Sequence, residues 1–158
     1  MKNSILNKLL PVILWIFISF IPAIVGGFFK PGSWYLEIIK PEWTPPGWIF
    51  GPVWFLLYLI MGISASIIWK LKNTYNIMLP IVFFIIQLIL NALWSWIFFG
   101  RHELLYSIID IVVLMIMIIV TIILFYRINK KAGLILLPYL LWVGFATVLN
   151  YNIWLLNR

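Results

Sequence analysis

Side chains able to do chemistry are few in this chain, and most of them are aromatic rings and carboxamides inside apolar runs. There is no cysteine and only one histidine, so disulfides, thiolate metal sites and histidine clusters are excluded. The sequence also lacks a glycine-rich nucleotide loop and a nucleophile paired with a base. We therefore predict no metal, no cofactor and no conventional catalytic residue. Any chemistry has to come from a ligand and from the aromatic rings.

Two stripes of amides and rings recur at helical spacing. The first has intervals of four, three and four, and consists of Gln87, Asn91, Trp94 and Phe98. The second has intervals of three, four and four, follows Pro138, and consists of Tyr139, Trp142, Ala146 and Asn150. Residues at these spacings share one helical face. Such faces predict either hydrogen bonds between helices or the wall of a pocket.

A third face combines rings with small residues. Trp54, Tyr58, Gly62 and Ala65 follow one another at intervals of four, four and three. A face that changes from aromatic to small predicts a pocket wall or a close helix contact. Pro52 lies just ahead of it inside an apolar run, so this helix is expected to kink there or to begin late.

Asp110 is the one ionisable residue well inside an apolar run. Ionisable residues at membrane depth usually mark a functional or structural polar centre. Two roles remain open for it from sequence. Its carboxyl group either accepts a hydrogen bond from a tryptophan or amide of a neighbouring helix, or takes part in proton transfer.

Composition determines which elements position these residues. The chain has 158 residues, 65% hydrophobic and 9% charged, with a mean hydropathy of +1.13. Its long apolar runs are each sufficient to cross about 30 Å of hydrocarbon, and they lack the alternating polarity of a barrel. We predict an all-α integral membrane protein, a single domain over 1–158 with five transmembrane helices at about 5–29, 45–70, 77–100, 103–126 and 133–156.

Residues 30–43 form the longest connection, "KPGSWYLEIIKPEW", which has prolines near both ends and an apolar middle. A loop of this kind is expected to fold over the mouth of the bundle as a lid.

The net charge of +7 has an uneven distribution. Five spans place Lys2, Lys8, Lys70, Lys72, Arg127, Lys130 and Lys131 on one side. The other side carries fewer basic residues, Lys30, Lys40, Arg101 and Arg158, together with three glutamates. The positive-inside rule predicts a cytoplasmic N-terminus and an outside C-terminus in a cell membrane. Because topology explains the basic excess, we predict no nucleic-acid partner.

Several motifs in order resemble a known family. "KPEWTPPGWIFGPVW", "QLILNALWSWIFFG", the following Asp110 and "LPYLLWVGFATVLNYNIW" are similar to motifs of the tryptophan-rich sensory protein family, the translocator proteins or peripheral benzodiazepine receptors. The resemblance implies a five-helix bundle, commonly a homodimer, with a pocket closed by the first loop. It also implies binding of tetrapyrroles such as protoporphyrin IX, haem-related compounds, benzodiazepine-type ligands and, in animals, cholesterol.

The resemblance further implies the ligand-binding residues. They are Trp34 in the first loop, Phe50, Val53 and Trp54 on the second span, Asn91 and Trp94 on the third, Tyr106, Asp110 and Val113 on the fourth, and Trp142, Ala146 and Leu149 on the fifth. Tyr106 stands where the family often has tryptophan, a change expected to alter the fit of a ligand.

The residue types fit a porphyrin independently. A flat macrocycle with two propionates needs ring faces and cationic or N–H donors at one edge. Ten tryptophans provide rings, and the predicted loop side provides Lys30, Lys40, Arg101 and His102. Sterol binding is not predicted, because six residues separate Tyr151 from Arg158 and the proposed sterol pattern allows at most five.

Three functions follow from the resemblance and these residues. A receptor for porphyrins and other hydrophobic ligands, acting in porphyrin homeostasis or sensing, comes first. Light- and oxygen-dependent porphyrin degradation, associated with some bacterial members, comes second, with Trp54 and Trp142 as redox participants. Tetrapyrrole transport comes third, because the sequence has no evident pair of broken helices of the kind that marks transporter sites.

Overall fold

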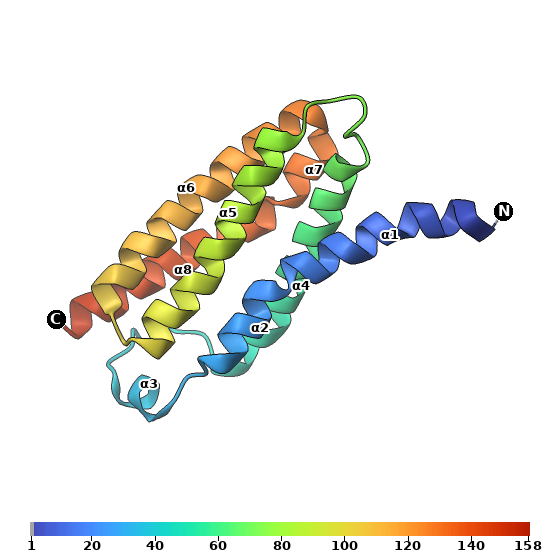
Figure 1. Ribbon diagram of the computed structural model, residues 1–158. Helices are drawn as coiled ribbons and strands as arrows, with labels where there is room; N and C mark the ends of the chain where they lie inside the picture. The colour runs from blue at the N-terminus through green and yellow to red at the C-terminus, as the bar shows by residue number, and fades with distance from the viewer. Residues whose placement is uncertain (1) are drawn as a thin grey trace.

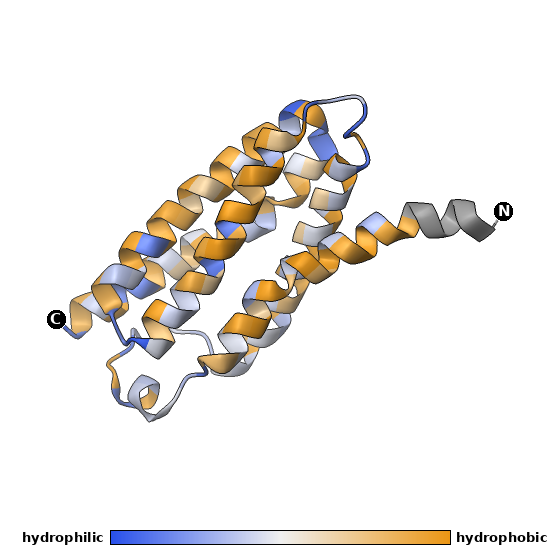
Figure 2. Ribbon diagram, in the orientation of Figure 1, coloured by the Kyte–Doolittle hydropathy of each residue, from blue (hydrophilic) through white to orange (hydrophobic). Residues whose placement is uncertain are grey.

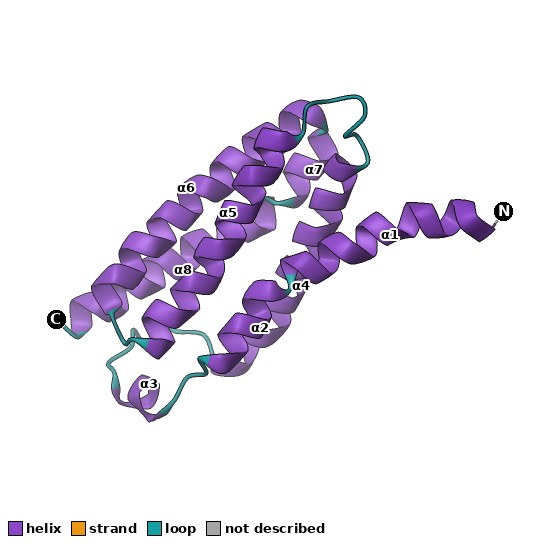
Figure 3. Cartoon of the chain, in the orientation of Figure 1, coloured by secondary structure: helices purple, strands orange, loops and turns teal. Residues whose placement is uncertain are grey.

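The computed structural model describes Lys2–Arg158, with side chains from Leu9 onward, and the described part contains helices and no strands (Figures 1 and 3). The helices in chain order are α1 (Lys2–Ser19), α2 (Ile21–Phe28), α3 (Ser33–Glu37), α4 (Gly47–Trp69), α5 (Met78–Ser95), the π-helical turn η1 (Trp96–Gly100), α6 (Leu104–Ile128), α7 (Lys130–Ile135) and α8 (Leu137–Leu156).

Five helical stretches are long and apolar enough to cross a membrane. They are Leu9–Phe28, Gly47–Trp69, Met78–Gly100, Leu104–Ile128 and Lys130–Leu156. Apolar residues make up most of these helices, and hydrophilic residues are frequent in the loops between them (Figure 2). Many large apolar side chains on the helices are exposed, among them Phe17, Leu56 and Leu141. The prediction of an all-α membrane protein with five spanning helices is confirmed.

Prolines explain where two of the spans break. The first span changes from α1 to α2 at Phe20, followed by Pro22, and the fifth changes from α7 to α8 at Leu136, followed by Pro138. A proline cannot donate its backbone nitrogen and fits best in the first turn of a helix. Two of the five spans therefore contain a break, which the predicted boundaries of the spans did not include.

Pro52 behaves differently. Helix α4 begins at Gly47, ahead of this proline, and continues through it to Trp69. Pro46 is the N-cap residue of α4. The alternative that the second span begins late, beyond Pro52, is therefore wrong.

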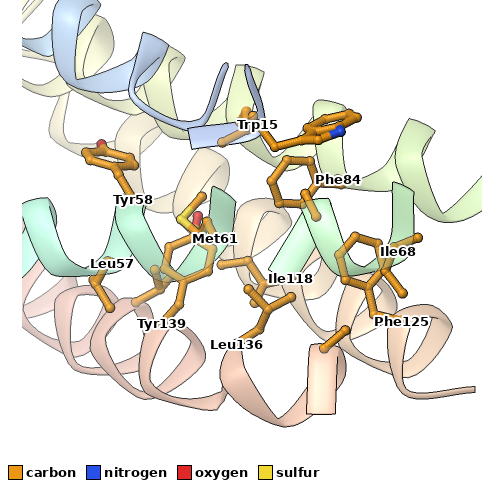
Figure 4. Packing of buried hydrophobic residues seen from close by; sticks show 14 of the residues in the cluster. Trp15, Leu57, Tyr58, Met61, Ile68, Phe84, Ile118, Phe125, Leu136 and Tyr139 are labelled. Atoms are coloured by element: carbon orange, nitrogen blue, oxygen red, sulfur yellow. The ribbon is translucent and has the colours of Figure 1, made fainter. Parts of the chain in front are cut away.

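The bundle is built on close helix pairs. Helix α4 packs on α1, α5 packs on α6 and α2, and α6 packs on α8, while the N-terminal part of α1 extends away from the other helices (Figure 1). The core between them contains Met61, Phe84, Ile118, Phe125 and Tyr139, all almost fully buried (Figure 4). This core occupies the half of the bundle away from the first loop and leaves the other half open for a cavity.

Candidate functional site

An aromatic cavity of about 530 Å³ lies inside the bundle, next to the first loop, which we define as residues 29–46. Helices α2, α4, α5, α6 and α8 and the turn η1 contribute to its wall. The residues at its loop end include Phe29, Lys30, Pro31, Tyr35 and Gly47. The volume is within the range of about 300–1,000 Å³ that small-molecule sites occupy.

Seven residues of the predicted site line this cavity. They are Phe50, Trp54, Asn91, Trp94, Trp142, Ala146 and Leu149. Three spans, the second, third and fifth, bring these side chains together from positions far apart in the sequence. Three of the seven are tryptophans, so ring faces and indole edges surround the cavity. Their role in binding stays a prediction.

Five residues of the predicted site lie outside the wall of this cavity: Trp34, Val53, Tyr106, Asp110 and Val113. On α6 the reason is helical phase. Tyr106 and Val113 lie roughly 40–60° further around the helix than Asp110, and their side chains are 60% and 39% exposed. Ile111 and Leu114 face the cavity instead.

In the first loop, the neighbouring Tyr35 faces the cavity instead of Trp34. Trp34 stacks on His102, with ring centroids 4.2 Å apart and planes at 11°. On α4, Val53 lines a separate groove on the outside of the bundle. In the first loop the facing position is thus a neighbour that was not predicted, whereas on α4 it is Trp54, which was predicted together with Val53.

The amides form hydrogen bonds between helices at the inner end of the cavity. The Tyr58 hydroxyl donates to Asn91 Oδ1 at 2.8 Å, and the Tyr139 hydroxyl donates to Gln87 Oε1 at 2.7 Å. Asn91 Nδ2 joins the two pairs by donating to the Tyr139 hydroxyl at 3.3 Å. These bonds connect α4, α5 and α8. Both predictions for the stripes thus apply to Asn91, which is hydrogen-bonded and also lines the cavity.

A second set of hydrogen bonds connects α5, α8 and α6. Trp94 Nε1 donates to Asn150 Oδ1 at 2.9 Å, and Asn150 Nδ2 donates to Ser107 Oγ at 3.0 Å. The indole of Trp94 is therefore fixed in orientation. Bonds of this type contribute roughly 0.6–2 kcal/mol in membrane proteins. The cavity wall is consequently preorganised on the α5 side.

Two buried polar atoms have no hydrogen-bond partner among the described residues: Trp142 Nε1 and Asp110 Oδ2. Trp142 lines the cavity, and its Nε1 atom is buried without a partner. Asp110 is only 6% exposed. The expected hydrogen bond from a tryptophan or amide to this Oδ2 is not formed within the described part of the chain.

Replacement of Asp110 tests how much the unpaired Oδ2 atom lowers the stability of the fold. A buried polar atom without a partner is unfavourable by about 1–3 kcal/mol, so we expect Asp110→Leu to leave the melting temperature in detergent unchanged or to raise it. Asn150→Leu is the matched control, because it removes an amide bonded to both Trp94 and Ser107, and it should lower the melting temperature. A clear loss of stability in Asp110→Leu but not in Asp110→Asn would contradict this expectation.

The first loop is attached to the far end of the chain by a contact absent from the sequence prediction. The Asn157 side chain accepts a hydrogen bond from Ile39 N at 3.0 Å and donates one to Ile39 O at 2.8 Å. Lys40 Nζ donates to the carbonyl oxygens of Tyr35 and Ile38 within the loop. Burial raises the pKa of the Tyr35 hydroxyl. No sequence signal connects residues so distant, since an asparagine after a helix usually caps it.

Residues of the first span also belong to the site and were not predicted. Phe20, Pro22, Ala23, Gly26 and Phe29 line the cavity. The segment "PAIVGGFF", residues 22–29, contains four of them, and its small residues are the one available signal. On the α5 side, η1 gives the helix end a π-helical turn, with Arg101 N donating to Trp96 O at 2.9 Å, a geometry common at functional sites.

Within the described part of the chain, no group of three or more histidine, cysteine, aspartate or glutamate residues is placed to hold a metal ion. The cavity presents aromatic side chains from several helices. These features define a multi-pass membrane protein with an internal aromatic cavity.

The chain belongs to the TspO/MBR family, whose model matches residues 9–155. The tryptophan-rich protein TspO of Chlorobaculum tepidum is 46% identical over 133 residues, covering 81% of this chain and 82% of that protein. The protein CrtK of Rhodobacter capsulatus is 38% identical, covering 84% and 83%. The human translocator protein is 36% identical, covering 82% and 80%. The predicted resemblance is confirmed, and membership supports a receptor-type role in the membrane.

Proposed function

We propose that the protein is a membrane receptor for tetrapyrroles such as protoporphyrin IX and for benzodiazepine-type hydrophobic ligands, acting in porphyrin homeostasis or sensing. The observation that carries this proposal is the cavity with Trp54, Trp94 and Trp142 in its wall and Lys30 at its loop end. Rings offer stacking surfaces for a macrocycle. A lysine at the mouth is suitably placed for a propionate that stays near water.

Titration of the purified protein with protoporphyrin IX in the dark tests the proposal. We expect saturable quenching of tryptophan fluorescence, weakened in Lys30→Gln because one cation at the mouth is lost. Lys72→Gln is the matched control, since Lys72 lies beyond the other end of α4, over the ring of Trp69, and it should bind like the unmodified protein. Quenching that does not saturate in the dark would contradict the proposal that the protein binds tetrapyrroles.

The first loop acts as a lid in this proposal. Its attachment by Asn157, the stack of Trp34 on His102 and the edge contact of Trp43 with Phe145 at 5.9 Å all support a closed position over the cavity. The cross-linking experiment described below tests whether the loop must open for a ligand to enter.

The orientation and assembly of the protein belong to the same proposal. Lys70 and Lys72 lie beyond the end of α4 that is away from the first loop, and Arg127, Lys130 and Lys131 lie in the last turn of α6 and the first turn of α7. Met1 and the side chains of Lys2 and Lys8 lie outside the described part. We expect a reporter fused at Arg158 to be outside the cytoplasm and one at Met1 to be inside, in the cell membrane of a bacterium. The reverse labelling would overturn the orientation.

The proposed homodimer is checked by light scattering in detergent, where a monomer mass would contradict it.

Photo-oxidative degradation of porphyrin is the second candidate, favoured by the direct position of Trp54 and Trp142 in the cavity wall. Transport remains third. Of the two helix breaks, Phe20 lies at the cavity, but Leu136 lies in the buried core. They do not form a pair around one site, the arrangement typical of transporters.

A further inference from the structure

A groove of about 560 Å³ runs along the outside of the bundle between α4 and α8. Its α4 side consists of Val53, Leu56, Leu57 and Ile60. Its α8 side consists of Pro138, Leu141, Trp142 and Phe145. Each set has intervals of three, one and three, which place it on a single helical face. The groove faces the hydrocarbon, since Leu56 is 58% and Leu141 is 74% exposed.

Only side chains separate this groove from the internal cavity. Helix α4 makes its close helix contacts with α1 and α7, and not with α8. Trp142 lines both the groove and the cavity. Its ring meets Phe50 of α4 edge-on at 5.7 Å and Phe145 of α8 at 5.4 Å. The indole of Trp142 is therefore shared by the wall of the groove and the wall of the cavity.

Nothing among the described residues holds that indole by a hydrogen bond. Trp142 Nε1 is unpaired, in contrast to Trp94, whose Nε1 is bonded to Asn150. The contacts of Trp142 are ring contacts, which constrain rotation less than a directional bond does. Rotation of one side chain displaces fewer atoms than the opening of a loop, which takes nanoseconds to microseconds. Rotation of this one side chain would join the groove to the cavity.

The other route into the cavity is obstructed by the first loop. Opening it requires separation of both Asn157 bonds from Ile39 and of the Trp34–His102 stack. A flat, largely apolar ligand concentrates in the bilayer and not in the water above this loop. The location of such a ligand in the bilayer and the position of Trp142 in both walls favour entry through the groove.

We propose that the groove between α4 and α8 is a lateral entrance, with Trp142 as its gate, through which flat apolar ligands pass from the bilayer into the cavity. The occupant of the groove is such a ligand on its way in or out. This inference rests on the proposed receptor function and adds the route of entry to it. An entrance changes association and dissociation equally and leaves the equilibrium affinity unchanged.

The test follows tryptophan quenching after the protein in vesicles is mixed with vesicles carrying protoporphyrin IX in the dark. Leu141→Trp and Leu56→Trp fill the groove at lipid-exposed positions that do not line the cavity. We expect both variants to slow association and dissociation by about tenfold or more, with Kd unchanged within about twofold. Ile116→Trp, on the exposed face of α6, is the control and should change neither rate.

A second experiment holds the first loop closed by a chemical cross-link. The chain has no cysteine, so Ile39→Cys with Asn157→Cys can be joined specifically by a short bifunctional thiol reagent. Entry at the rate of the uncross-linked protein supports the lateral route. Normal rates in both groove variants, together with blocked entry after cross-linking, would overturn it in favour of entry under the loop. Absence of saturable quenching in the unmodified protein would instead show that the receptor function itself is wrong.

Discussion

Replacement of Gly62 by alanine is expected to cost about 1–3 kcal/mol of stability, the usual penalty for overpacking, and replacement by leucine to detach α1 from the bundle. A Cβ atom at Gly62 would lie 2.5 Å from Ile16 Cα and 2.7 Å from Ile16 N. Both are backbone atoms, so no side-chain rotation can relieve the clash. The helices α1 and α4 would have to separate, and the contact of Trp15 with Trp69 at 5.4 Å would be lost with them.

The measurement is thermal unfolding in detergent, with Gly144→Ala as the matched control. Gly144 also lies inside a spanning helix, but a Cβ atom there meets nothing within 4 Å. Because alanine is the better helix former, Gly144→Ala should be neutral or gain up to about 1 kcal/mol. Equal melting temperatures for the two alanine variants would show that the approach of α1 to α4 is not tight.

Gly62 also shows what the sequence could and could not predict. The face of Trp54, Tyr58, Gly62 and Ala65 predicted a pocket wall or a helix contact, and it provides both. Trp54 and Tyr58 line the cavity, while Gly62 and Ala65 lie in the packed half. Helical spacing identifies a shared face, but it does not indicate where along that face a cavity ends. That boundary depends on which helix packs opposite.

The same limit applies to the site residues. Phe50 and Trp142 were expected in the site because the resemblance to the family implied them, and both line the cavity. Trp34 and Val53 were implied in the same way but lie outside the cavity wall, since one step along a loop or a helix turns a side chain to another surface. The contact of Asn157 with the first loop could not be predicted, for a different reason. Its partner is the backbone of Ile39, and a backbone partner leaves no trace in residue types.

The five spans were predictable because the hydrocarbon of the bilayer determines which segments of the chain can cross it. Runs of about 20 apolar residues have no stable alternative to a helix within a bilayer. The breaks at Phe20 and Leu136 are each followed by a proline that is visible in the sequence, but hydropathy is continuous across both. Hydropathy thus locates a span, and backbone hydrogen bonding determines its internal geometry.

Replacement of the cavity tryptophans by phenylalanine separates binding from chemistry, and it is expected to slow light-driven loss of the porphyrin spectrum by more than tenfold. Trp54 stacks on Tyr58 with centroids 5.4 Å apart, and Trp142 lies across the cavity wall on α8. An excited porphyrin in contact with an indole can take one electron from it, with oxygen as the final acceptor. Phenylalanine retains an apolar ring but is much harder to oxidise.

Dark affinity for protoporphyrin IX in Trp54→Phe and Trp142→Phe should therefore stay within about tenfold of the unmodified protein, a change of no more than roughly 1.4 kcal/mol. Trp69→Phe is the control, because Trp69 packs on Trp15 and lies outside the cavity wall, and it should change neither quantity. The two readouts are dark titration and the decay of porphyrin absorbance under constant illumination. Decay at the unmodified rate in both cavity variants, with porphyrin still bound, would remove the tryptophans from the reaction and leave plain photosensitisation of oxygen by the ligand.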